Sequence, residues 1–363
     1  MKINPAIFKI KFTKVIYITI FWMLVSLYFR FLTYLLFLHS SDPLNRDFVL
    51  SLVTSTIAAM FAGLIFGSFE MFYFKDRFRK KTFIYSLFVK SIFYFSSTLV
   101  AVFIFFAVYN IFHHNISVLD PHLYQLTFSY MFKVGSLVFF SIWIVVLFLT
   151  LFFIQVSDRF GQGTLMSFLF GKYHSPKEEE RIFMFLDIKS STTIAEKFGH
   201  SRYFNLLNDF FYDITDSIIY NKGEVYQYVG DEVVISWKLN KGVESANCIK
   251  CFFDIKDVIK KNSEYYKDNY GLVPEFKAGL HCGIVTAGEV GIFKKEIVYS
   301  GDVLNTASRI QEICNKYKKK LLVSERLLNI LTVKEKYSTE EIDVLKLKGK
   351  AKQIRLFNIE RLN

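Results

Sequence analysis

The stretch Gly223–Trp237, GEVYQYVGDEVVISW, contains two short apolar runs on either side of Gly230-Asp231-Glu232. Apolar and β-branched runs around a Gly-Asp turn predict a β-hairpin, which would hold the Asp231 carboxylate at a strand end. A second run, Arg181–Leu186, predicts a buried strand that ends at Asp187. Two acids at the ends of neighbouring strands are suited to divalent cations, which prefer carboxylate oxygens. The turn alone would equally suit a hairpin without chemistry.

Composition separates the two halves of the chain. The 363 residues are enough for two domains, and 52% of them are apolar, too many for an ordinary soluble enzyme. Residues 1–160 contain 14 Lys+Arg and 6 Asp+Glu, so +8 of the net charge of +12 lies in the apolar half. Basic residues beside apolar segments favour a membrane protein and argue against nucleic-acid binding.

Four long apolar segments precede the first predicted strand. Each is long enough to cross a hydrocarbon core of roughly 30 Å as a helix. Each also lacks the polar face that a core helix of a soluble bundle would have. We therefore expect an α-helical membrane domain over residues 1–156, embedded in the lipid bilayer. Its four transmembrane helices are predicted at residues 15–38, 48–74, 84–112 and 134–154.

The connections between these segments predict the orientation in the membrane. Lys and Arg are frequent before the first segment and between the second and third, whereas residues 113–127 contain neither. The positive-inside rule then places both termini in the cytoplasm, in a multi-pass protein of the cell (inner) membrane. Histidines on or near the outer side would allow a response to an extracytoplasmic signal, although ordinary interfacial residues would look the same. These histidines are His39, His113, His114 and His122.

The remainder of the chain alternates between predicted strands and helices. Residues 157–180 contain several glycines and three consecutive Glu, and we interpret them as a coupling segment. Residues 181–363 then form an α+β domain of ordinary size. The pattern predicts strands at Glu275–His281 and Ile284–Glu289, a helix at Asp302–Tyr317 and a last hairpin around Lys348-Gly349-Lys350.

Four stretches of this domain resemble the class III nucleotidyl (adenylate/guanylate) cyclases, in the order found in that family. They are FLDIKSST (185–192), YVGDEVVISW (228–237), GLHCGIVTAGEVG (279–291) and GDVLNTASRI (301–310). The resemblance covers about half of the chain and implies a catalytic domain with a ferredoxin-like core. It also implies an enzyme, a phosphorus–oxygen lyase, in which a ribose 3′-hydroxyl attacks the α-phosphorus of a nucleoside triphosphate and expels pyrophosphate. It implies nothing about the membrane half.

The resemblance assigns a metal site to three residues. Asp187 and Asp231 match the two metal-binding acids of the family, and the carbonyl of Ile188 would join them. Together they would bind two divalent metal ions, Mg²⁺ or Mn²⁺, which suit phosphoryl transfer in general.

Three more residues match catalytic positions of the family. Asn305 would orient the ribose, Arg309 would stabilise the transition state, and Lys348 would bind the terminal phosphates. A spacing of four places Asn305 and Arg309 on one helix face. In the family these residues and the metal acids come from different catalytic domains. A chain with one such domain is therefore expected to form a homodimer with two equivalent sites.

The two positions that select the base match neither usual pattern. Adenylate cyclases usually have Lys and Asp or Thr there, and guanylate cyclases have Glu and Cys; this chain has Gln227 and Val298. A carboxamide can pair with adenine, whereas the 2-amino group of guanine would meet an apolar valine. We therefore predict ATP as the substrate of a membrane-anchored adenylate cyclase that produces 3′,5′-cyclic AMP and pyrophosphate.

Other interpretations of the second half remain open. One is a guanylate or mixed-specificity cyclase. Another is a degenerate domain that binds nucleotide and signals by dimerisation, against which the intact Asp187, Asp231, Asn305 and Arg309 argue. A diguanylate cyclase also has a GDE-like turn, but the NTASR motif disfavours it.

Overall fold

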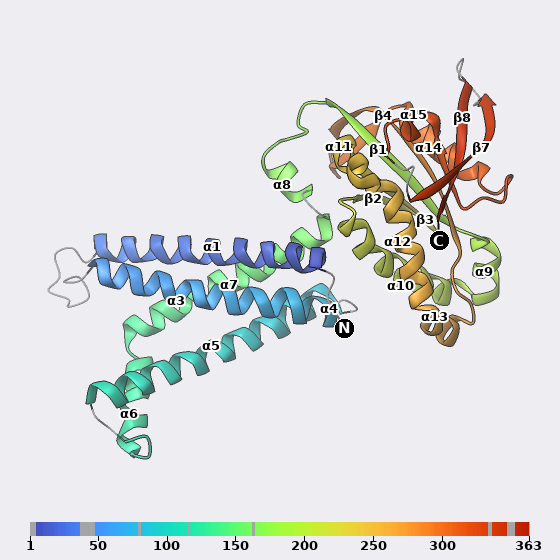
Figure 1. Ribbon diagram of the computed structural model, residues 1–363. Helices are drawn as coiled ribbons and strands as arrows, with labels where there is room; N and C mark the ends of the chain where they lie inside the picture. The colour runs from blue at the N-terminus through green and yellow to red at the C-terminus, as the bar shows by residue number, and fades with distance from the viewer. Residues whose placement is uncertain are drawn as a thin grey trace. The chain divides into compact units, whose positions relative to one another are not determined.

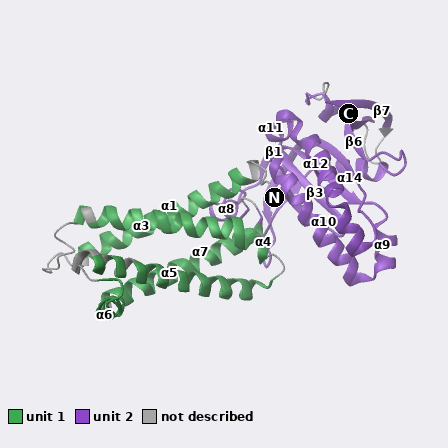
Figure 2. Cartoon of the chain, turned by 60° about the horizontal axis from the view of Figure 1, so that its bottom comes forward, with its two compact units in different colours: residues 1–160 green, residues 161–363 purple. Residues whose placement is uncertain are grey.

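The computed structural model divides the chain into two compact units, Met1–Phe160 and Gly161–Asn363 (Figure 2). It describes residues 5–36, 48–78, 81–114, 117–161, 164–332, 336–346 and 353–362. Each unit has a hydrophobic core of its own.

Long apolar helices make up the first unit (Figure 1). They are α1 (Pro5–Leu36), α3 (Phe48–Phe69), α5 (Phe83–His114) and α7 (Val134–Phe160). Among the residues that the structure describes, four stretches are long and apolar enough to cross a membrane: Phe8–Leu35, Ser51–Phe74, Phe83–Ile104 and Gly135–Phe160. Large apolar side chains such as Leu24 and Phe88 stay exposed along them, as a lipid surrounding permits. The prediction of four apolar helices that precede an α+β domain is therefore confirmed.

Shorter helices connect these four. They are the π-helix η1 (Glu70–Phe74), α4 (Lys75–Arg77) and α6 (Pro121–Met131). The sequence pattern did not predict α6, although its start signal was present. The Asp120 carboxylate accepts a hydrogen bond of 2.8 Å from the backbone N–H of His122, and Pro121 is the first helical residue. His122 is the one candidate outer histidine whose side chain lies among the described residues.

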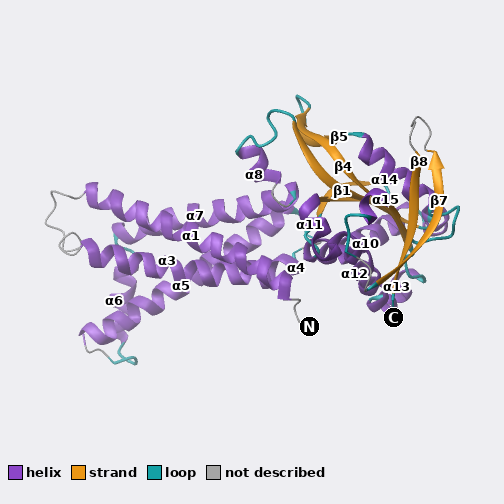
Figure 3. Ribbon diagram, turned by 45° about the horizontal axis from the view of Figure 1, so that its top comes forward, coloured by secondary structure: helices purple, strands orange, loops and turns teal. Residues whose placement is uncertain are grey.

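The second unit is an α+β domain built on one mixed sheet (Figure 3). Its strands are β1 (Lys177–Ile188), β2 (Glu224–Val229), β3 (Glu232–Lys238), β4 (Phe276–Val290), β5 (Glu296–Ser300), β6 (Leu321–Ser324), β7 (Tyr337–Lys346) and β8 (Gln353–Arg361). Their order is β2-β3-β1-β4-β6-β8-β7, with β5 paired to β4. Its helices are α8 (Thr164–Leu169), α9 (Ser191–Phe198), α10 (His200–Tyr220), α11 (Leu239–Val243), η2 (Glu244–Ala246), α12 (Asn247–Lys261), α13 (Ser263–Tyr270), α14 (Asp302–Ile313) and α15 (Glu325–Leu328).

Strand β1 lies between β3 and β4 and pairs with both in antiparallel fashion. Side chains alternate between the two faces of a strand. Ile182, Met184 and Leu186 therefore enter the larger core, which residues of α10 and α12 complete. Phe183 and Phe185 enter a smaller core that includes two residues of α14. Because side chains alternate along the strand, Asp187 projects from the same face as Phe183 and Phe185, the face on which α14 packs.

Two predicted strand boundaries were wrong. The first strand begins at Lys177, four residues before the predicted start, because its charged residues pair with β4 as far as Ala287. The two strands predicted on either side of Gly283 are one continuous strand, β4. A Cβ at Gly283 would lie 2.7 Å from a methyl group of Val303, so this glycine permits close packing of α14 on β4 and does not interrupt the strand.

A buried arginine joins four strands of the sheet. Arg181 is 1% exposed, and its Nε donates to Glu179 Oε2 at 2.9 Å. Its Nη1 donates to Ser236 Oγ at 3.0 Å and to Glu224 Oε2 at 3.2 Å. The guanidinium also lies 4.4 Å from the ring centroid of Tyr299. These contacts connect β1 to β2, β3 and β5, and the sequence pattern had assigned Arg181 no role.

We predict that Arg181→Leu destabilises the second unit by about 3–5 kcal/mol, because it removes the closer of the two cations that neutralise the partly buried Glu179 and leaves only Lys172, at 3.6 Å. Thermal unfolding of the full chain in detergent measures this loss. Arg355→Leu is the matched control: it removes an exposed ion pair with Glu325, 3.5 Å long, and should cost less than about 1 kcal/mol. Equal losses in the two variants would contradict a structural role for Arg181.

Candidate active site

Charged side chains converge on Asp187 near the end of β1. Glu232 is its partner on β3, and Lys277 is its partner on β4. Directly opposed residues of antiparallel strands project from the same face. The Lys277 Nζ lies 3.2 Å from Asp187 Oδ2, and Gln311 of α14 donates its Nε2–H to the same oxygen at 2.8 Å. Sheet register and one helix therefore position this carboxylate.

The β2–β3 turn brings the second acid to the same place. Gly230 adopts a φ of +62°, a conformation in which residues with a Cβ are strained. Asp231 follows it at the tip of the turn, directly before β3. The predicted hairpin is therefore present, and its acid is a neighbour of Asp187, as the electrostatics of the site show.

Mutual repulsion shapes the protonation of these acids. Burial, a hydrogen bond from the protonated Asp187 to Asp231 and the charge of Asp231 raise the pKa of Asp187 to about 6, against the opposing effect of Lys277. Burial and the charges of Asp187, Asp231 and Glu312 raise the pKa of Glu232 to about 7. Carboxyl groups held this closely favour a bound cation, which relieves their repulsion.

The donors at this place fit a divalent ion. The Asp187 and Asp231 carboxylates and the Ile188 carbonyl are hard oxygen ligands of the kind that Mg²⁺ and Mn²⁺ prefer. The Ile188 side chain is buried in the core, so only its backbone is available. Within the described parts of the chain, no three acidic, His or Cys side chains are grouped closely enough to bind an ion. Because Mg²⁺ commonly has one or two carboxylates plus water and phosphate oxygens, the site fits an ion that binds with a triphosphate.

Helix α14 presents two different faces. Its buried residues are Val303, Thr306, Ala307, Ile310 and Gln311. Asn305 is exposed and Arg309 is half-buried. At 3.6 residues per turn, Arg309 lies about 200° around the helix from Gln311, which contacts Asp187. The helix therefore places Gln311 at the acids, whereas Asn305 and Arg309 belong to a different face.

The two positions predicted to select the base lie on neighbouring segments. Gln227 is exposed on β2, and Val298 is half-buried on β5. The residues next to them, Tyr226 and Tyr299, are in contact, with ring centroids 5.0 Å apart and a hydrogen bond of 3.3 Å from the Tyr299 N–H to the Tyr226 hydroxyl. The β2 and β5 segments of the same chain are therefore in contact. Lys348 lies outside the described residues.

The sequence analysis missed several members of this site. Lys277, Gln311, Glu232 and Glu312 had no assigned role. Lys277 gave a usable signal: it is a lysine among the apolar residues at the start of β4, and it is only 6% exposed. A buried lysine requires a nearby counter-charge. The contact of Gln311 gave no such signal, because it depends on how α14 packs.

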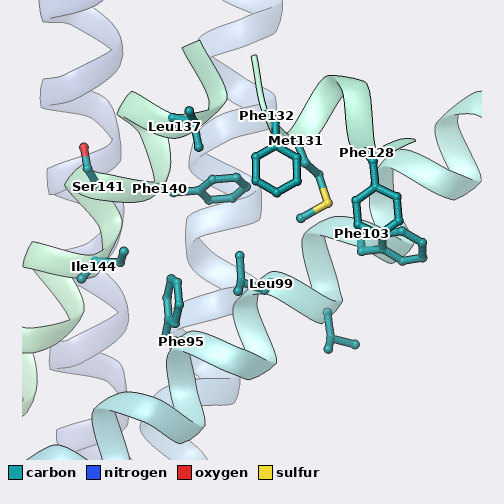
Figure 4. Close-up of a pocket in the computed structure, with 11 residues that line it drawn as sticks. Phe95, Leu99, Phe103, Phe128, Met131, Phe132, Leu137, Phe140, Ser141 and Ile144 are labelled. Carbon is teal, nitrogen blue, oxygen red and sulfur yellow. The ribbon is translucent and has the colours of Figure 1, made fainter. Parts of the chain in front are cut away.

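The first unit contains an apolar cavity without charged side chains in its lining (Figure 4). It has a volume of 570 Å³, and apolar side chains such as Phe95, Leu99 and Phe140 line it. Ser141 is the one polar residue in its lining. A cavity without charged groups does not suit a triphosphate.

The fold and the acid cluster define the second unit as a nucleotidyl cyclase catalytic domain. Comparison with known proteins agrees with this class. The model of the Adenylate and Guanylate cyclase catalytic domain family matches residues 174–360, and the chain belongs to this family.

Some of the relatives are named adenylate cyclases and others are named guanylyl cyclases. The chain is 33% identical over 209 residues to adenylate cyclase 2 of Rhizobium meliloti (strain 1021), covering 58% of each chain. It is 31% identical over 170 residues to retinal guanylyl cyclase 2 of Rattus norvegicus, covering 46% of this chain and 15% of that one. The chain thus spans less than two thirds of either relative. A solved bacterial light-regulated adenylyl cyclase shares the fold, with a TM-score of 0.54, 19% identity and coverage of 63% and 67%.

We predict that the metal-free protein loses stability between about pH 4 and pH 7. The pKa values of about 6 for Asp187 and about 7 for Glu232 in the folded state exceed the ordinary 3.8 and 4.5. The folded protein therefore binds more protons than the unfolded chain in this range, and its stability falls as the pH rises. Thermal unfolding in EDTA across this range measures the decline.

Glu232→Gln should flatten the upper part of that decline. The exposed Glu264 on α13 supplies the control, since Glu264→Gln changes the same charge away from the cluster. A decline of the same steepness in Glu232→Gln and in the wild type would refute the crowding of these acids.

Proposed function

We propose that this chain is a membrane-anchored adenylate cyclase that converts ATP to 3′,5′-cyclic AMP and pyrophosphate in a homodimer. Membership of the cyclase family and the likeness to a protein named adenylate cyclase 2 support the reaction class. The observation on which the proposal rests is the pairing of Asp187 with Asp231 at the strand ends.

In this reaction the ribose 3′-oxygen forms a bond to the α-phosphorus of ATP. The bond from that phosphorus to the bridging oxygen breaks, pyrophosphate leaves, and the hydroxyl proton is released. Two Mg²⁺ or Mn²⁺ ions, held by Asp187, Asp231 and the Ile188 carbonyl, would supply charge compensation for the triphosphate and the attacking oxygen.

Other residues of the chain would bind and orient the substrate. Asn305 hydrogen-bonds the ribose, and Arg309 compensates the charge that develops on the α-phosphate. Lys348 binds the terminal phosphates. Lys277 favours the ionised form of Asp187 against the repulsion of Asp231, so that the carboxylate is available as a ligand at neutral pH.

The two faces of α14 support a homodimer. Gln311 contacts Asp187 of its own chain, whereas Asn305 and Arg309 lie on a different face of the helix. A second copy related by two-fold symmetry would supply Asn305 and Arg309 to the acids of the first, and the converse. Each dimer then contains two equivalent sites.

The membrane half would anchor the enzyme. The four apolar helices and the basic residues at Lys75–Lys81 support a multi-pass protein of the cell (inner) membrane, with both termini and the catalytic domain in the cytoplasm. We divide the chain into a membrane domain (1–156), a coupling segment (157–180) and a catalytic domain (181–363).

A guanylate or mixed-specificity cyclase is the second candidate. Gln227 favours this alternative in part, because its amide can turn over and pair with O6 and N1–H of guanine. The 2-amino group of guanine would then face Val298, and an unpaired donor in a buried place costs roughly 1–3 kcal/mol. ATP is therefore the better substrate.

We predict that Asp187→Asn and Arg309→Ala chains are each inactive alone, with turnover reduced by about 10³-fold or more, and recover activity when mixed. Heterodimers from the two variants have one complete site of the two. Random pairing makes half of the dimers heterodimers, so the mixture should reach roughly a quarter of wild-type activity. Cyclic AMP formation by co-expressed chains with different affinity tags measures this.

The control pair is Asp187→Asn with Asp231→Asn. Both changes affect the acid side of a site, so neither site of the heterodimer is complete and no activity should return. Heterodimers that form without recovering activity in the first mixture would exclude a shared site. Near-normal turnover in Asp187→Asn alone would exclude the metal role.

We also predict that the wild type uses ATP about tenfold or more better than GTP, in kcat/KM, because of the unpaired guanine donor. Gln227→Ala should reduce this ratio toward one and lower kcat/KM for ATP. Turnover of each triphosphate with Mn²⁺ gives both values. A higher kcat/KM for GTP in the wild type would make the second candidate the better one.

A further inference from the structure

A second concentration of charge lies in the membrane unit, where η1, α4, the start of α5 and the end of α7 meet. Residues of these elements line an open cavity of 290 Å³. Charged and polar side chains dominate its lining, in contrast to the apolar cavity of the same unit. The lining residues with these side chains are Glu70, Lys75, Lys81, Ser86, Lys90, Gln155, Asp158 and Arg159.

One wall of this cavity is an ion pair buried among apolar helices. Lys90 of α5 donates a short hydrogen bond to Glu70 of η1, and their side chains are only 4% and 2% exposed. Tyr94 adds a hydrogen bond of 3.3 Å to the other Glu70 oxygen. Ionised groups at such depth are expensive, and they commonly mark functional sites. The π-helix that begins at Glu70 is a further feature often found at such sites.

The charges of the lining do not balance. Its four cations are opposed by two carboxylates, which leaves an excess of two positive charges. Lys90 pairs with Glu70, and Lys75 pairs with Asp158 at 3.0 Å. The remaining two, Lys81 and Arg159, lie over the rings of Tyr85 and Phe83, at 5.7 and 5.3 Å. Neither has a carboxylate partner among the ion pairs of the described residues.

The cavity also has an amide donor without a partner. Gln155 Nε2 is buried and makes no hydrogen bond within the described residues. A buried donor left in this state costs about 1–3 kcal/mol, which an acceptor would recover. Two cations in excess and one unused donor together suit an anion with several oxygen acceptors.

We propose that this cavity binds a phosphate-bearing anion of headgroup size, held by Lys81, Arg159 and Gln155. Phosphate offers several acceptor oxygens and a charge that matches the excess in the lining. The volume is at the small end of ligand pockets, which range over about 300–1,000 Å³. Lys81, Asp158 and Arg159 lie at or just beyond the ends of apolar spans, the height at which lipid phosphates lie. Basic pockets between transmembrane helices bind anionic headgroups in this position.

The same chemistry could come from a phospholipid or from soluble phosphate, and two experimental arms separate these sources. In the first, the full chain is placed in phosphatidylcholine nanodiscs with or without phosphatidylglycerol, and native mass spectrometry measures the lipid retained. In the second, inorganic phosphate is added to phosphatidylcholine nanodiscs, and thermal unfolding is measured. Wild type is compared with Lys81→Gln, Gln155→Leu and the control Lys9→Gln. Lys9 is an exposed residue of α1 outside the cavity lining.

The variants separate a site from general attraction to an anionic surface. Lys81→Gln and Lys9→Gln remove the same charge, but only the first should weaken binding, by about tenfold. Gln155→Leu should weaken binding without lowering the stability of the ligand-free protein, because it removes an unpaired buried donor. This pattern with phosphatidylglycerol identifies a lipid site, and with inorganic phosphate it identifies a soluble anion. Equal effects of Lys81→Gln and Lys9→Gln in both arms, or full binding in Gln155→Leu, would overturn the proposal.

Discussion

Repulsion between carboxylates at the end of the central strand is the constraint on which the catalytic unit depends. Asp187 and Asp231 come from segments that are distant in the sequence, and burial raises the cost of their charges. Lys277 and Gln311 contact the same Asp187 oxygen and fix its position. The fold thus holds Asp187 and Asp231 close enough to repel each other. A divalent ion bound with a triphosphate would relieve this repulsion. Burial of these carboxylates would lower the stability of the metal-free protein at neutral pH. It would also favour the binding of a divalent cation beside them.

A buried arginine joins the strands of the sheet from which the acid cluster projects. Arg181 ties β1 to β2, β3 and β5 through charged and aromatic contacts. Arg181 lies in the first half of β1 and Asp187 lies near its end. One strand therefore connects the contacts of the buried arginine to the acid cluster. Tyr299 contacts both Arg181 and Tyr226, next to Val298 and Gln227, the two positions proposed to select the base. The buried Arg181 therefore helps to position the segments that carry these two residues.

Charge is buried in both units, but with different consequences. In the catalytic unit the excess is negative and fits cations. In the membrane unit the cavity lining has more cations than carboxylates and fits an anion. Gln155 and Arg159, which line that cavity, lie in the last turns of α7, shortly before the boundary between the units at Phe160. An anion bound there would contact the last turns of α7, which ends at the boundary between the units in the sequence.

Local patterns in the sequence determined the apolar helices, the hairpin and the positions of the two acids, although they did not predict α6. The four apolar helices follow from composition alone, and the hairpin follows from a Gly-Asp turn between β-branched runs. Tertiary structure alone decided what surrounds the acids. Sheet register placed Lys277 opposite Asp187, and the packing of α14 brought Gln311 to the same carboxylate while Arg309 remained on another face. Such contacts join residues far apart in the sequence, and no local periodicity encodes which strands pair or how a helix rotates on its sheet.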